Sequence, residues 1–474
     1  MLFNSAEFFI FLLIVFVLYW RFKGNIKVQN VIILVSSYVF YGWWDIRFLL
    51  LIFVSSLTDY LVGIQIFNSK NWEKKLYLGL SLIINLGLLV VFKYYNFFID
   101  SFEHITAFFG ITVRLNMLHL ILPVGISFYT FQTLSYSLDI YRGKIKPTKN
   151  FINFFGYVSF FPQLVAGPIE RAANLLPQFE KKRTFRFENA ADGMRLIIYG
   201  LFKKIVIADN LGSAVDNIFT NYEKFSGLEL CLGAMYFIIQ LYCDFSGYSD
   251  IAIGTAKLFG FKLMTNFKVP LFSKSIPEFW NRWHISLTTW FRDYLFIPLA
   301  KYKKNSLLWR IIATIILYII IGFWHGANYT FLLFGLLMGI YYIPKYLSKN
   351  YTFLRKTIKF LNNNRIISPL VIFSSFFLLS FTTILFRSPN IESAFDYMSH
   401  IFVKDFFKLG KTIYSQLPMI IAFLTFEWIM KDKKHQFDIR TFNKNLRVFL
   451  YVALILVILL FGNFGKDPFF YFQF

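Results

Sequence analysis

The sequence has few of the residues on which soluble proteins depend. Of its 474 residues, 16% are charged, 26 are Asp or Glu, six are His and two are Cys. The two cysteines, Cys231 and Cys243, lie among apolar residues, which argues against a disulfide framework and a cysteine metal site. A chain of this size with so little charge is not expected to be a soluble domain, because a single core cannot bury so much apolar surface.

The sequence also lacks the short motifs of many soluble enzymes. It contains no G-x-x-x-x-G-K-S/T phosphate loop, no G-x-G-x-x-G fingerprint and no H-E-x-x-H zinc motif. The segment GYSDI (247–251) lacks the second glycine of a G-x-S-x-G nucleophile elbow. His284 and His325 alone would make a poor metal site, so we expect neither a bound metal nor a bound cofactor.

Apolar and aromatic residues dominate the chain, at 57% and 21%, and the mean hydropathy is +0.54. Several apolar runs reach the length that crosses a bilayer as a helix, and lipid offers no partner for free backbone groups. We predict an all-α polytopic membrane protein with about 11–13 membrane-embedded helices. A single domain is expected over residues 1–474, with core motifs at 122–345 and a final helix and aromatic tail at 446–474. The main apolar runs are 8–20, 31–44, 48–66, 76–92, 311–321, 331–343, 370–386 and 448–461.

The net charge is +23, and the basic residues form short clusters between the apolar runs. In a soluble protein this charge would indicate nucleic-acid binding. Here it is typical of cytoplasmic loops beside anionic lipid, so we expect a lipid bilayer and no nucleic acid as partner. One cluster could also bind an acidic cofactor such as coenzyme A. Glu7 before the first run, and Arg21 and Lys23 after it, predict an uncleaved helix with an extracytoplasmic N-terminus.

Charged side chains at membrane depth are costly and are candidates for function. They are densest in residues 239–300. Pro270, Pro277 and Pro298 interrupt this region and predict short re-entrant or interfacial helices around a water-accessible cavity. The alternative is an amphipathic interfacial helix with snorkelling arginines and a tryptophan belt. The polar side chains concerned are Asp244, Asp250, Glu278, Arg282, His284, Arg292 and Asp293.

A second polar feature is the lone imidazole of His325 in IGFWHGANYTF (321–331). Trp324, Gly326 and Asn328 form a tight turn beside it. Glycine allows close backbone approach, and Asn328 could donate to a developing oxyanion. Such a histidine can be a catalyst, a satisfied core residue or part of a proton relay, and the residues alone leave all three open.

At these residues the sequence resembles the membrane-bound O-acyltransferase family. More narrowly, it resembles the bacterial branch that acetylates alginate or peptidoglycan and D-alanylates teichoic acids. The opening MLFNSAEFFIFL and the segment SSYVFYGWWD (36–45) also fit, so the resemblance covers essentially the whole chain. Five blocks carry the match: LPVGISFYTFQTLSYSLDIYRG (122–143), FFPQLVAGPIERA (160–172), LYCDFSGYSDIAIG (241–254), FWNRWHISLTTWFRDYLFIPL (279–299) and GFWHGANYTFLLFG (322–335).

The resemblance implies a ring of tilted helices around a tunnel that links a cytoplasmic funnel to an outer cavity. It places the catalytic histidine of the family at His325 and the second histidine of the branch at His284. Acyl transfer needs a base near the acceptor hydroxyl, and imidazole titrates near neutral pH. We therefore expect His325 to be the base, His284 to orient donor or acceptor, and acetyl-CoA to be the donor. The residues expected to bind substrate are Trp324, Asn328, Arg282, Arg292 and Asp293.

The last residues, GKDPFFYFQF (465–474), form the aromatic tail. They resemble the tyrosine-containing tail of this branch and that of a small companion protein in teichoic acid D-alanylation. The resemblance implies that Tyr471 carries acetyl as an ester and passes it to a periplasmic SGNH-type O-acetyltransferase. The alternative is an aromatic interfacial anchor. The basic stretch 431–447 predicts that the C-terminus is extracytoplasmic.

Together these features predict an O-acetyltransferase of the bacterial inner membrane that moves acetyl from cytoplasmic acetyl-CoA to an envelope polysaccharide. Peptidoglycan is the expected acceptor and alginate the alternative, while teichoic acid D-alanylation fits the opening and the tail less well. A transporter or flippase, with His325 in a proton relay, is an alternative of another class, although no paired repeats are visible. A structural scaffold does not account for two histidines in such surroundings.

Overall fold

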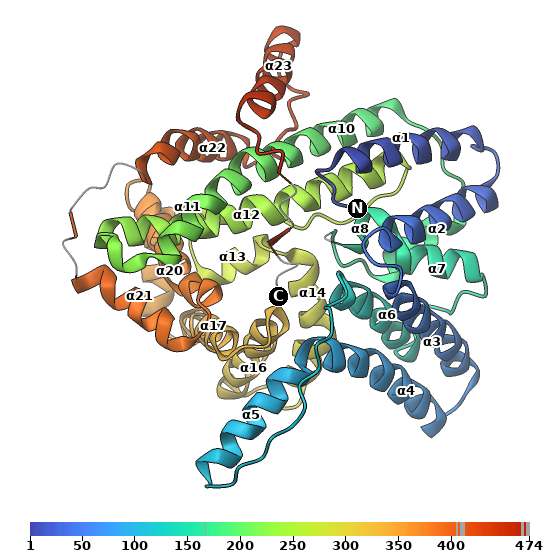
Figure 1. Cartoon of the computed structure of the whole chain (residues 1–474), viewed down its shortest axis with the longest axis horizontal. Helices are drawn as coiled ribbons and strands as arrows, with labels where there is room; N and C mark the ends of the chain where they lie inside the picture. The colour runs from blue at the N-terminus through green and yellow to red at the C-terminus, as the bar shows by residue number, and fades with distance from the viewer. Residues whose placement is uncertain (166, 404–405, 408–412, 466–468, 471–474) are drawn as a thin grey trace. The chain divides into compact units, whose positions relative to one another are not determined.

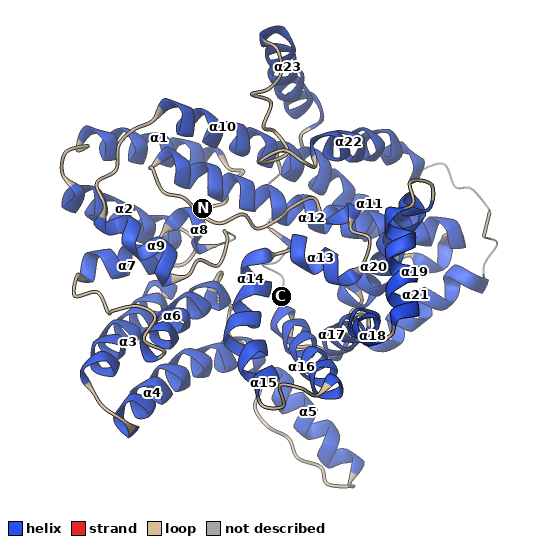
Figure 2. Ribbon diagram, turned by 180° about the vertical axis from the view of Figure 1, so that it is seen from behind, coloured by secondary structure: helices blue, strands red, loops and turns tan. Residues whose placement is uncertain are grey.

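The computed structural model describes residues 1–165, 167–403, 406–407, 413–465 and 469–470 (Figure 1). In these ranges the regular structure is helical throughout, which confirms the predicted all-α class (Figure 2). The contacts divide the chain into two compact units. Unit 1 comprises Met1–Met194 and Ile251–Met264, and unit 2 comprises Arg195–Asp250 and Thr265–Phe474. The prediction that residues 1–474 make a single domain stays a prediction.

Unit 1 contains most of the N-terminal helices. Its helices are α1 (Ala6–Arg21), α2 (Ile26–Gly42), α3 (Phe48–Asn68), α4 (Trp72–Leu89), the π-helix η1 (Val90–Tyr94), α5 (Tyr95–Phe108), α6 (Ile126–Tyr141), α7 (Phe151–Ser159), α8 (Phe161–Leu164), α9 (Ala172–Glu180) and the first part of α10 (Phe187–Leu201). Helix α12 (Gly227–Leu258) runs from unit 2 into unit 1.

Unit 2 contains the region of dense polar residues. Its helices after α10 and before α16 are the π-helix η2 (Phe202–Ala208), α11 (Asp209–Thr220), the 3₁₀ turn η3 (Tyr222–Lys224), the 3₁₀ turn η4 (Pro270–Phe272), α13 (Ile276–Arg282), α14 (Ile285–Phe291), the π-helix η5 (Arg292–Phe296) and α15 (Ile297–Lys301). The rest are α16 (Leu307–His325), α17 (Tyr329–Ile340), α18 (Ile343–Asn350), α19 (Thr352–Asn363), α20 (Ile367–Arg387), α21 (Ile391–Val403), the 3₁₀ turn η6 (Ile413–Gln416), α22 (Leu417–Met430) and α23 (Lys444–Phe461).

Seven helical stretches of the described chain are long and apolar enough to cross a membrane, so the chain is a polytopic membrane protein. The prediction of 11–13 embedded helices also counts shorter helices, of which α2 is one. The ring and the tunnel stay predictions. The seven stretches are Phe48–Asn68, Trp72–Phe108, Gly227–Leu258, Leu307–His325, Tyr329–Asn350, Ile367–Arg387 and Lys444–Phe461.

A buried carboxylate joins three helices of unit 1. Asp59 of α3 is 0% exposed and accepts hydrogen bonds from Ser81 Oγ at 2.5 Å and Asn85 Nδ2 at 2.6 Å, both on α4. It also accepts a hydrogen bond from the Ser137 hydroxyl of α6. Polar side chains that bond across helices stabilise packing where lipid offers no alternative partner. The cluster therefore fixes the register of α3, α4 and α6.

In unit 2, α16 and α17 pack closely through glycines (Figure 2). A Cβ atom on Gly322 of α16 would lie 2.2 Å from the Phe331 carbonyl oxygen. A Cβ atom on Gly335 of α17 would lie 2.3 Å from the Tyr318 carbonyl oxygen. Small residues at such an interface let two helix backbones approach. This approach fixes His325, the last residue of α16, close to the start of α17.

Candidate active site

The His284 turn is a strained piece of backbone between α13 and α14. His284 has φ 42° and ψ 53°, the left-handed region that residues other than glycine seldom adopt. Asn266, from the loop before η4, holds the turn: its carbonyl accepts from Ile285 N at 2.9 Å. Its side-chain oxygen accepts from Ser286 N at 3.2 Å and Ser286 Oγ at 2.8 Å. Strain held in this way by its surroundings is typical of functional sites.

Asn266 is a residue that the sequence analysis missed. It is 1% exposed, and its amide nitrogen also donates to Ser249 Oγ of α12 at 3.1 Å. The loop that carries it has no motif, so only its spatial neighbours identify it. The side chain therefore ties α12 to the turn that positions His284.

We expect Asn266→Ala to lower the free energy of unfolding by about 2–4 kcal/mol, because it leaves several buried polar groups without their hydrogen bonds. The measurement is thermal unfolding of the purified protein in detergent. Asn445→Ala, at an exposed position of α23, is the control and should change little. Equal stability of the two variants would contradict the role of Asn266.

His284 itself is completely buried among aromatic rings. Its ring centroid lies 4.6 Å from Phe245 and 5.8 Å from Trp324. Burial disfavours the charged imidazolium and lowers the pKa of His284 to about 3. The imidazole is therefore neutral throughout the physiological pH range.

This lowered pKa predicts a pH dependence of stability. Below about pH 6.5 the unfolded chain protonates His284 while the folded chain does not, so stability is full above that pH and falls as the pH drops. The contribution lost between pH 7.5 and pH 5 is about 2 kcal/mol. His284→Gln should remove that part of the slope in detergent melting curves.

The melting curves of wild type and His284→Gln must be compared with each other, because Glu170 of unit 1 changes the stability with pH in the opposite direction. Burial raises the pKa of the Glu170 carboxyl to about 7, so its contribution is full below about pH 4.5 and is lost as the pH rises through 7. Glu170 is unchanged in the His284→Gln variant and cancels in the difference. Parallel curves for wild type and His284→Gln would contradict the assignment of a neutral, buried imidazole.

His325 and His284 both contact the same tryptophan, Trp324. His325 is 2% exposed, and its ring centroid lies 4.8 Å from Trp324 and 5.2 Å from Phe386 of α20. Trp324 therefore contacts both histidines, which lie 41 positions apart in the chain. A Cβ atom on Gly326 would lie 2.1 Å from the Phe331 ring, so the absence of a side chain at Gly326 makes room for this ring.

His325 lines a small cavity of about 20 Å³ in unit 2. That volume holds about one water molecule. An apolar lining of this kind excludes bulk water, which protects a reactive acyl donor from hydrolysis. The other lining residues are Ile238, Leu241, Phe279, Trp280, Trp283, Phe334, Met338, Leu379, Thr383 and Phe386.

The model of MBOAT, the membrane-bound O-acyltransferase family, matches residues 145–387, a range that contains both histidines. The chain belongs to the membrane-bound O-acyltransferase family. It is therefore an acyltransferase and a multi-pass membrane protein, as the sequence predicted.

Named bacterial relatives of this acyltransferase are similar over most of the chain. The "Probable alginate O-acetylase AlgI" of Pseudomonas putida is 34% identical, over 94% of this chain and 89% of the relative. The "Peptidoglycan O-acetyltransferase" of Helicobacter pylori is 35% identical, over 83% of this chain and 78% of the relative. The "Teichoic acid D-alanyltransferase" of Bacillus subtilis is 29% identical over 56% of this chain.

The other predicted site residues of the acyltransferase lie nearer the surface. Arg282 pairs with Glu278 at 2.7 Å, and Arg292 pairs with Asp293 at 2.8 Å. The two arginine side chains are 37% and 56% exposed, so both are accessible to an anionic group. Their roles in substrate binding stay predictions.

Asn328 caps helix α17. Its side-chain oxygen accepts from Thr330 N at 3.0 Å, and its amide nitrogen donates to the Pro389 carbonyl at 2.7 Å. One of its two amide hydrogens is thus committed. Donation by Asn328 to an oxyanion stays a prediction and would use the other hydrogen.

Two buried lysines of the acyltransferase also escaped the sequence analysis. Lys203 and Lys204 are 1% and 2% exposed on the π-helix η2, a distortion that often occurs at functional sites. A Cβ atom on Gly247 of α12 would lie 2.7 Å from the Gly200 carbonyl oxygen, so Gly247 lets α12 approach this helix. Two adjacent lysines inside the apolar segment FKKIVIA (202–208) were the available signal.

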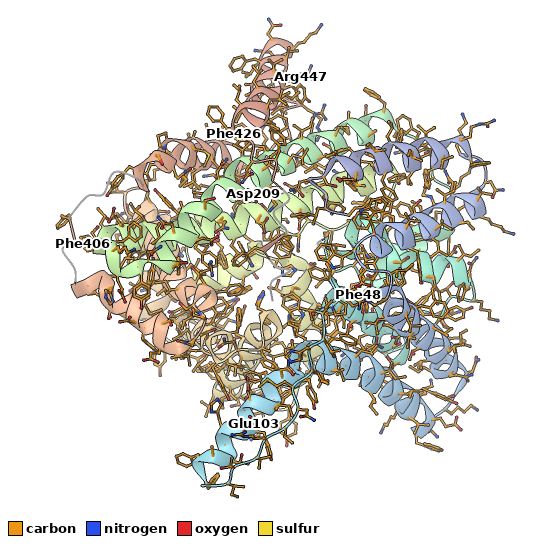
Figure 3. All side chains as sticks on the ribbon, viewed as in Figure 1. Phe48, Glu103, Asp209, Phe406, Phe426 and Arg447 are labelled. Atoms are coloured by element: carbon orange, nitrogen blue, oxygen red, sulfur yellow. The ribbon has the colours of Figure 1, made fainter. Side chains whose placement is uncertain are left out.

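Each lysine has its own carboxylates. Lys203 Nζ binds Asp250 at 2.6 Å and donates to Ser246 Oγ at 2.9 Å. Lys204 Nζ lies 2.6 Å from Asp209, labelled in Figure 3, and 2.9 Å from Asp244. Both positive charges are therefore neutralised inside unit 2.

The tail residue Tyr471, predicted as an acyl carrier, lies outside the described residues. Phe469 and Phe470 are described and are 0% and 8% exposed. The aromatic tail thus has two buried side chains immediately before Tyr471 in the sequence.

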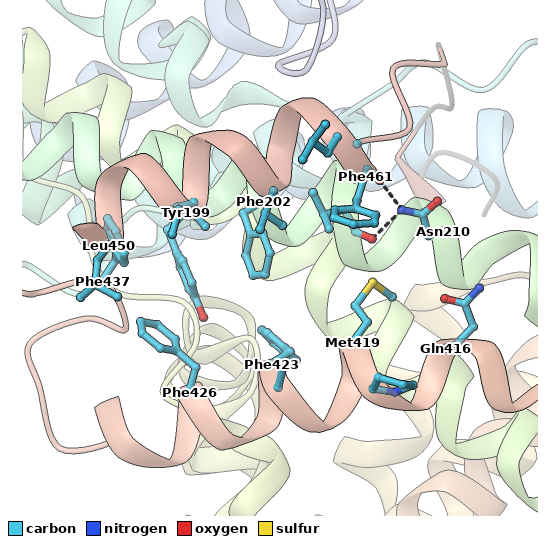
Figure 4. Close-up of a pocket in the computed structure, with 18 of the residues that line it drawn as sticks. Tyr199, Phe202, Asn210, Gln416, Met419, Phe423, Phe426, Phe437, Leu450 and Phe461 are labelled. Carbon is cyan, nitrogen blue, oxygen red and sulfur yellow. Dashed lines mark hydrogen bonds between the residues drawn. The ribbon is translucent and has the colours of Figure 1, made fainter. Parts of the chain in front are cut away.

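A large apolar groove of about 990 Å³ lies between η2, α22 and α23 (Figure 4). Phe202, Phe423 and Phe426 point into it, and Asn210 Nδ2 donates to the Phe461 carbonyl at its edge at 2.8 Å (Figure 4). Neither His284 nor His325 is among the residues that line it. This groove is therefore separate from the two histidines.

Proposed function

We propose that this acyltransferase moves acetyl from cytoplasmic acetyl-CoA across the inner membrane for O-acetylation of an extracytoplasmic polysaccharide. The observation that carries the proposal is that Trp324 contacts both His284 and His325, and that all three side chains are buried. The relatives named as O-acetylases and O-acetyltransferases support acetyl as the group transferred. Both termini are proposed to be extracytoplasmic.

In the proposed reaction, His325 is the general base. Its imidazole takes the proton of the attacking hydroxyl while the oxygen forms a bond to the thioester carbonyl carbon. The C–S bond then breaks, and the thiolate of coenzyme A leaves and takes that proton from the imidazolium. Asn328 is proposed to stabilise the oxyanion.

His284 is proposed to orient donor or acceptor as a neutral hydrogen-bonding group, because its pKa keeps it uncharged. Trp324 is proposed to bind the acyl end of the donor between the two histidines. Arg282 and Arg292, each beside its own carboxylate, are proposed to hold the phosphate or pantetheine end of acetyl-CoA at the cytoplasmic entrance, with Asp293 orienting Arg292.

Tyr471 is proposed to receive the acetyl group as an aryl ester and to pass it to a periplasmic SGNH-type O-acetyltransferase. An aryl ester is more activated than an alkyl ester, which suits a carrier. The burial of Phe469 and Phe470, which precede Tyr471 directly, supports this assignment.

Peptidoglycan is the proposed final acceptor, supported by the 35% identity to the Helicobacter pylori protein. Alginate is the second candidate, favoured by the Pseudomonas relatives, of which that of Pseudomonas aeruginosa is 37% identical over 83% of this chain. The two acceptors share the same hydroxyl chemistry, so the site does not distinguish them.

The experiment is to delete the gene and measure ester-linked acetate released by mild base from purified peptidoglycan and from exopolysaccharide. Loss from peptidoglycan, restored by the wild-type gene and not by His325→Ala, is the expected result. Loss of ester-linked acetate from exopolysaccharide alone would make alginate the proposed acceptor in place of peptidoglycan. Unchanged acetate in both fractions would overturn it.

A further inference from the structure

Phe469 and Phe470, the two described residues of the tail after Gly465, pack against α12 in unit 2. The Phe469 ring lies 5.2 Å from Phe245, and the Phe470 ring lies 5.5 Å from Phe237. Phe245 in turn lies 4.6 Å from His284. A single side chain of α12 therefore connects the tail to the candidate active site.

The backbone amide of Phe470 is held by a buried carboxylate, that of Asp244. Phe470 N donates to Asp244 Oδ2 at 2.8 Å, and the other oxygen of Asp244 lies 2.9 Å from Lys204 Nζ. Lys204 is held in turn by Asp209 at 2.6 Å. An amide that donates to a buried carboxylate makes a stronger hydrogen bond than one between neutral groups. Removing one member of such a network leaves a buried charge without compensation.

We propose that Asp244 and Lys204 are positioning residues that latch Phe470 of the C-terminal tail to α12, on which Phe245 contacts both Phe469 and His284. The latch rests on the proposed function in one respect only, namely that the group carried by the tail is acetyl. Lys204 fixes one oxygen of Asp244, which leaves the other to accept from the Phe470 amide. Tyr471 follows Phe470 directly in the sequence, so the latch holds the residue that precedes the proposed carrier.

The neighbouring ion pair provides a matched control. Lys203 is as buried as Lys204 and lies on the same π-helix, but it pairs with Asp250 and Ser246. None of these contacts involves the tail. If Lys204→Met acted through a general loss of packing around η2, Lys203→Met would speed exchange at Phe470 to the same extent. If it acts through the latch, only Lys204→Met should speed that exchange.

The test is hydrogen–deuterium exchange of the Phe470 amide in the full-length protein in detergent, read by mass spectrometry with residue-resolved fragmentation. Lys204→Met and Asp244→Asn should speed its exchange by at least about tenfold, because Asp244→Asn removes the charge of the acceptor and Lys204→Met removes the ammonium that orients Asp244. Lys203→Met should leave the exchange of this amide unchanged. Phe469→Ala removes a tail side chain and no buried charge, and it should also speed exchange of the Phe470 amide. This variant is the substitute test if the Lys204 and Asp244 variants fail to fold.

Slow exchange in Lys204→Met, Asp244→Asn and Phe469→Ala would overturn the latch, and so would equally fast exchange in Lys203→Met. The measurement needs no acetyl donor, so it is independent of the proposed reaction. Tyr471→Phe should keep slow exchange at Phe470. Acetylation that persists in that variant would reject the carrier and leave the latch standing.

Discussion

Replacement of His325 by alanine is expected to reduce acetyl transfer by a factor on the order of 10³, the contribution typical of a positioned general base. The loss should appear in the rate of transfer and not in the amount of inserted protein. His325 packs against Trp324 and Phe386 through ring contacts, so the alanine variant leaves a small cavity in a wall that is otherwise intact. The measurement is release of coenzyme A from acetyl-CoA by purified protein in liposomes with a hydroxyl acceptor.

The control for this experiment is His400→Ala. His400 lies on α21, its side chain is 25% exposed, and it contacts Asp396 and Tyr222, which are not site residues. It should retain full transfer. If His325→Ala transfers acetyl at the rate of His400→Ala, the base is another group.

Tyr471→Phe is expected to abolish delivery of acetyl to the polysaccharide, because it removes the hydroxyl that forms the ester and keeps the aromatic ring. An interfacial anchor would tolerate this change, since phenylalanine remains aromatic and apolar. The measurement is base-labile acetate on purified polysaccharide from cells that express each variant at equal level. Tyr302→Phe, at an exposed position before α16, is the control.

Retained acetylation in Tyr471→Phe would show that the acceptor enters the site directly. The general base and the histidine pair would then stand, while the carrier would be rejected. Acetylation lost in both Tyr471→Phe and Tyr302→Phe would instead indicate a general sensitivity of the protein to loss of tyrosine hydroxyls.

The sequence predicts the fold class well, because the class depends on local patterns, while the location of the site stays a prediction. Apolar runs of spanning length can only be helices in lipid. Pro270, Pro277 and Pro298 predicted short helices, and η4, α13 and α15 each contain one of them. The blocks around His284 and His325 predicted that both histidines serve one site, and the structure brings both into contact with Trp324.

The residues that hold the site in place could not be predicted, because they contact residues that are far away in the sequence. Asn266 has no motif, and its importance follows only from the left-handed turn at His284 that it holds. Lys203 and Lys204 point inward together on a π-helix, a distortion that no hydrophobic period indicates. The bond from the Phe470 amide to Asp244 joins residues that are 226 positions apart.

The most direct test of the account is mass spectrometry of the purified protein after incubation with isotopically labelled acetyl-CoA, in wild type, His325→Ala and Tyr471→Phe. One labelled acetyl group is expected on the C-terminal peptide of wild type, and none on that peptide in either variant. A labelled peptide in His325→Ala, or no label in a folded wild-type protein that still releases coenzyme A, would contradict the central claim that His325 transfers acetyl to Tyr471.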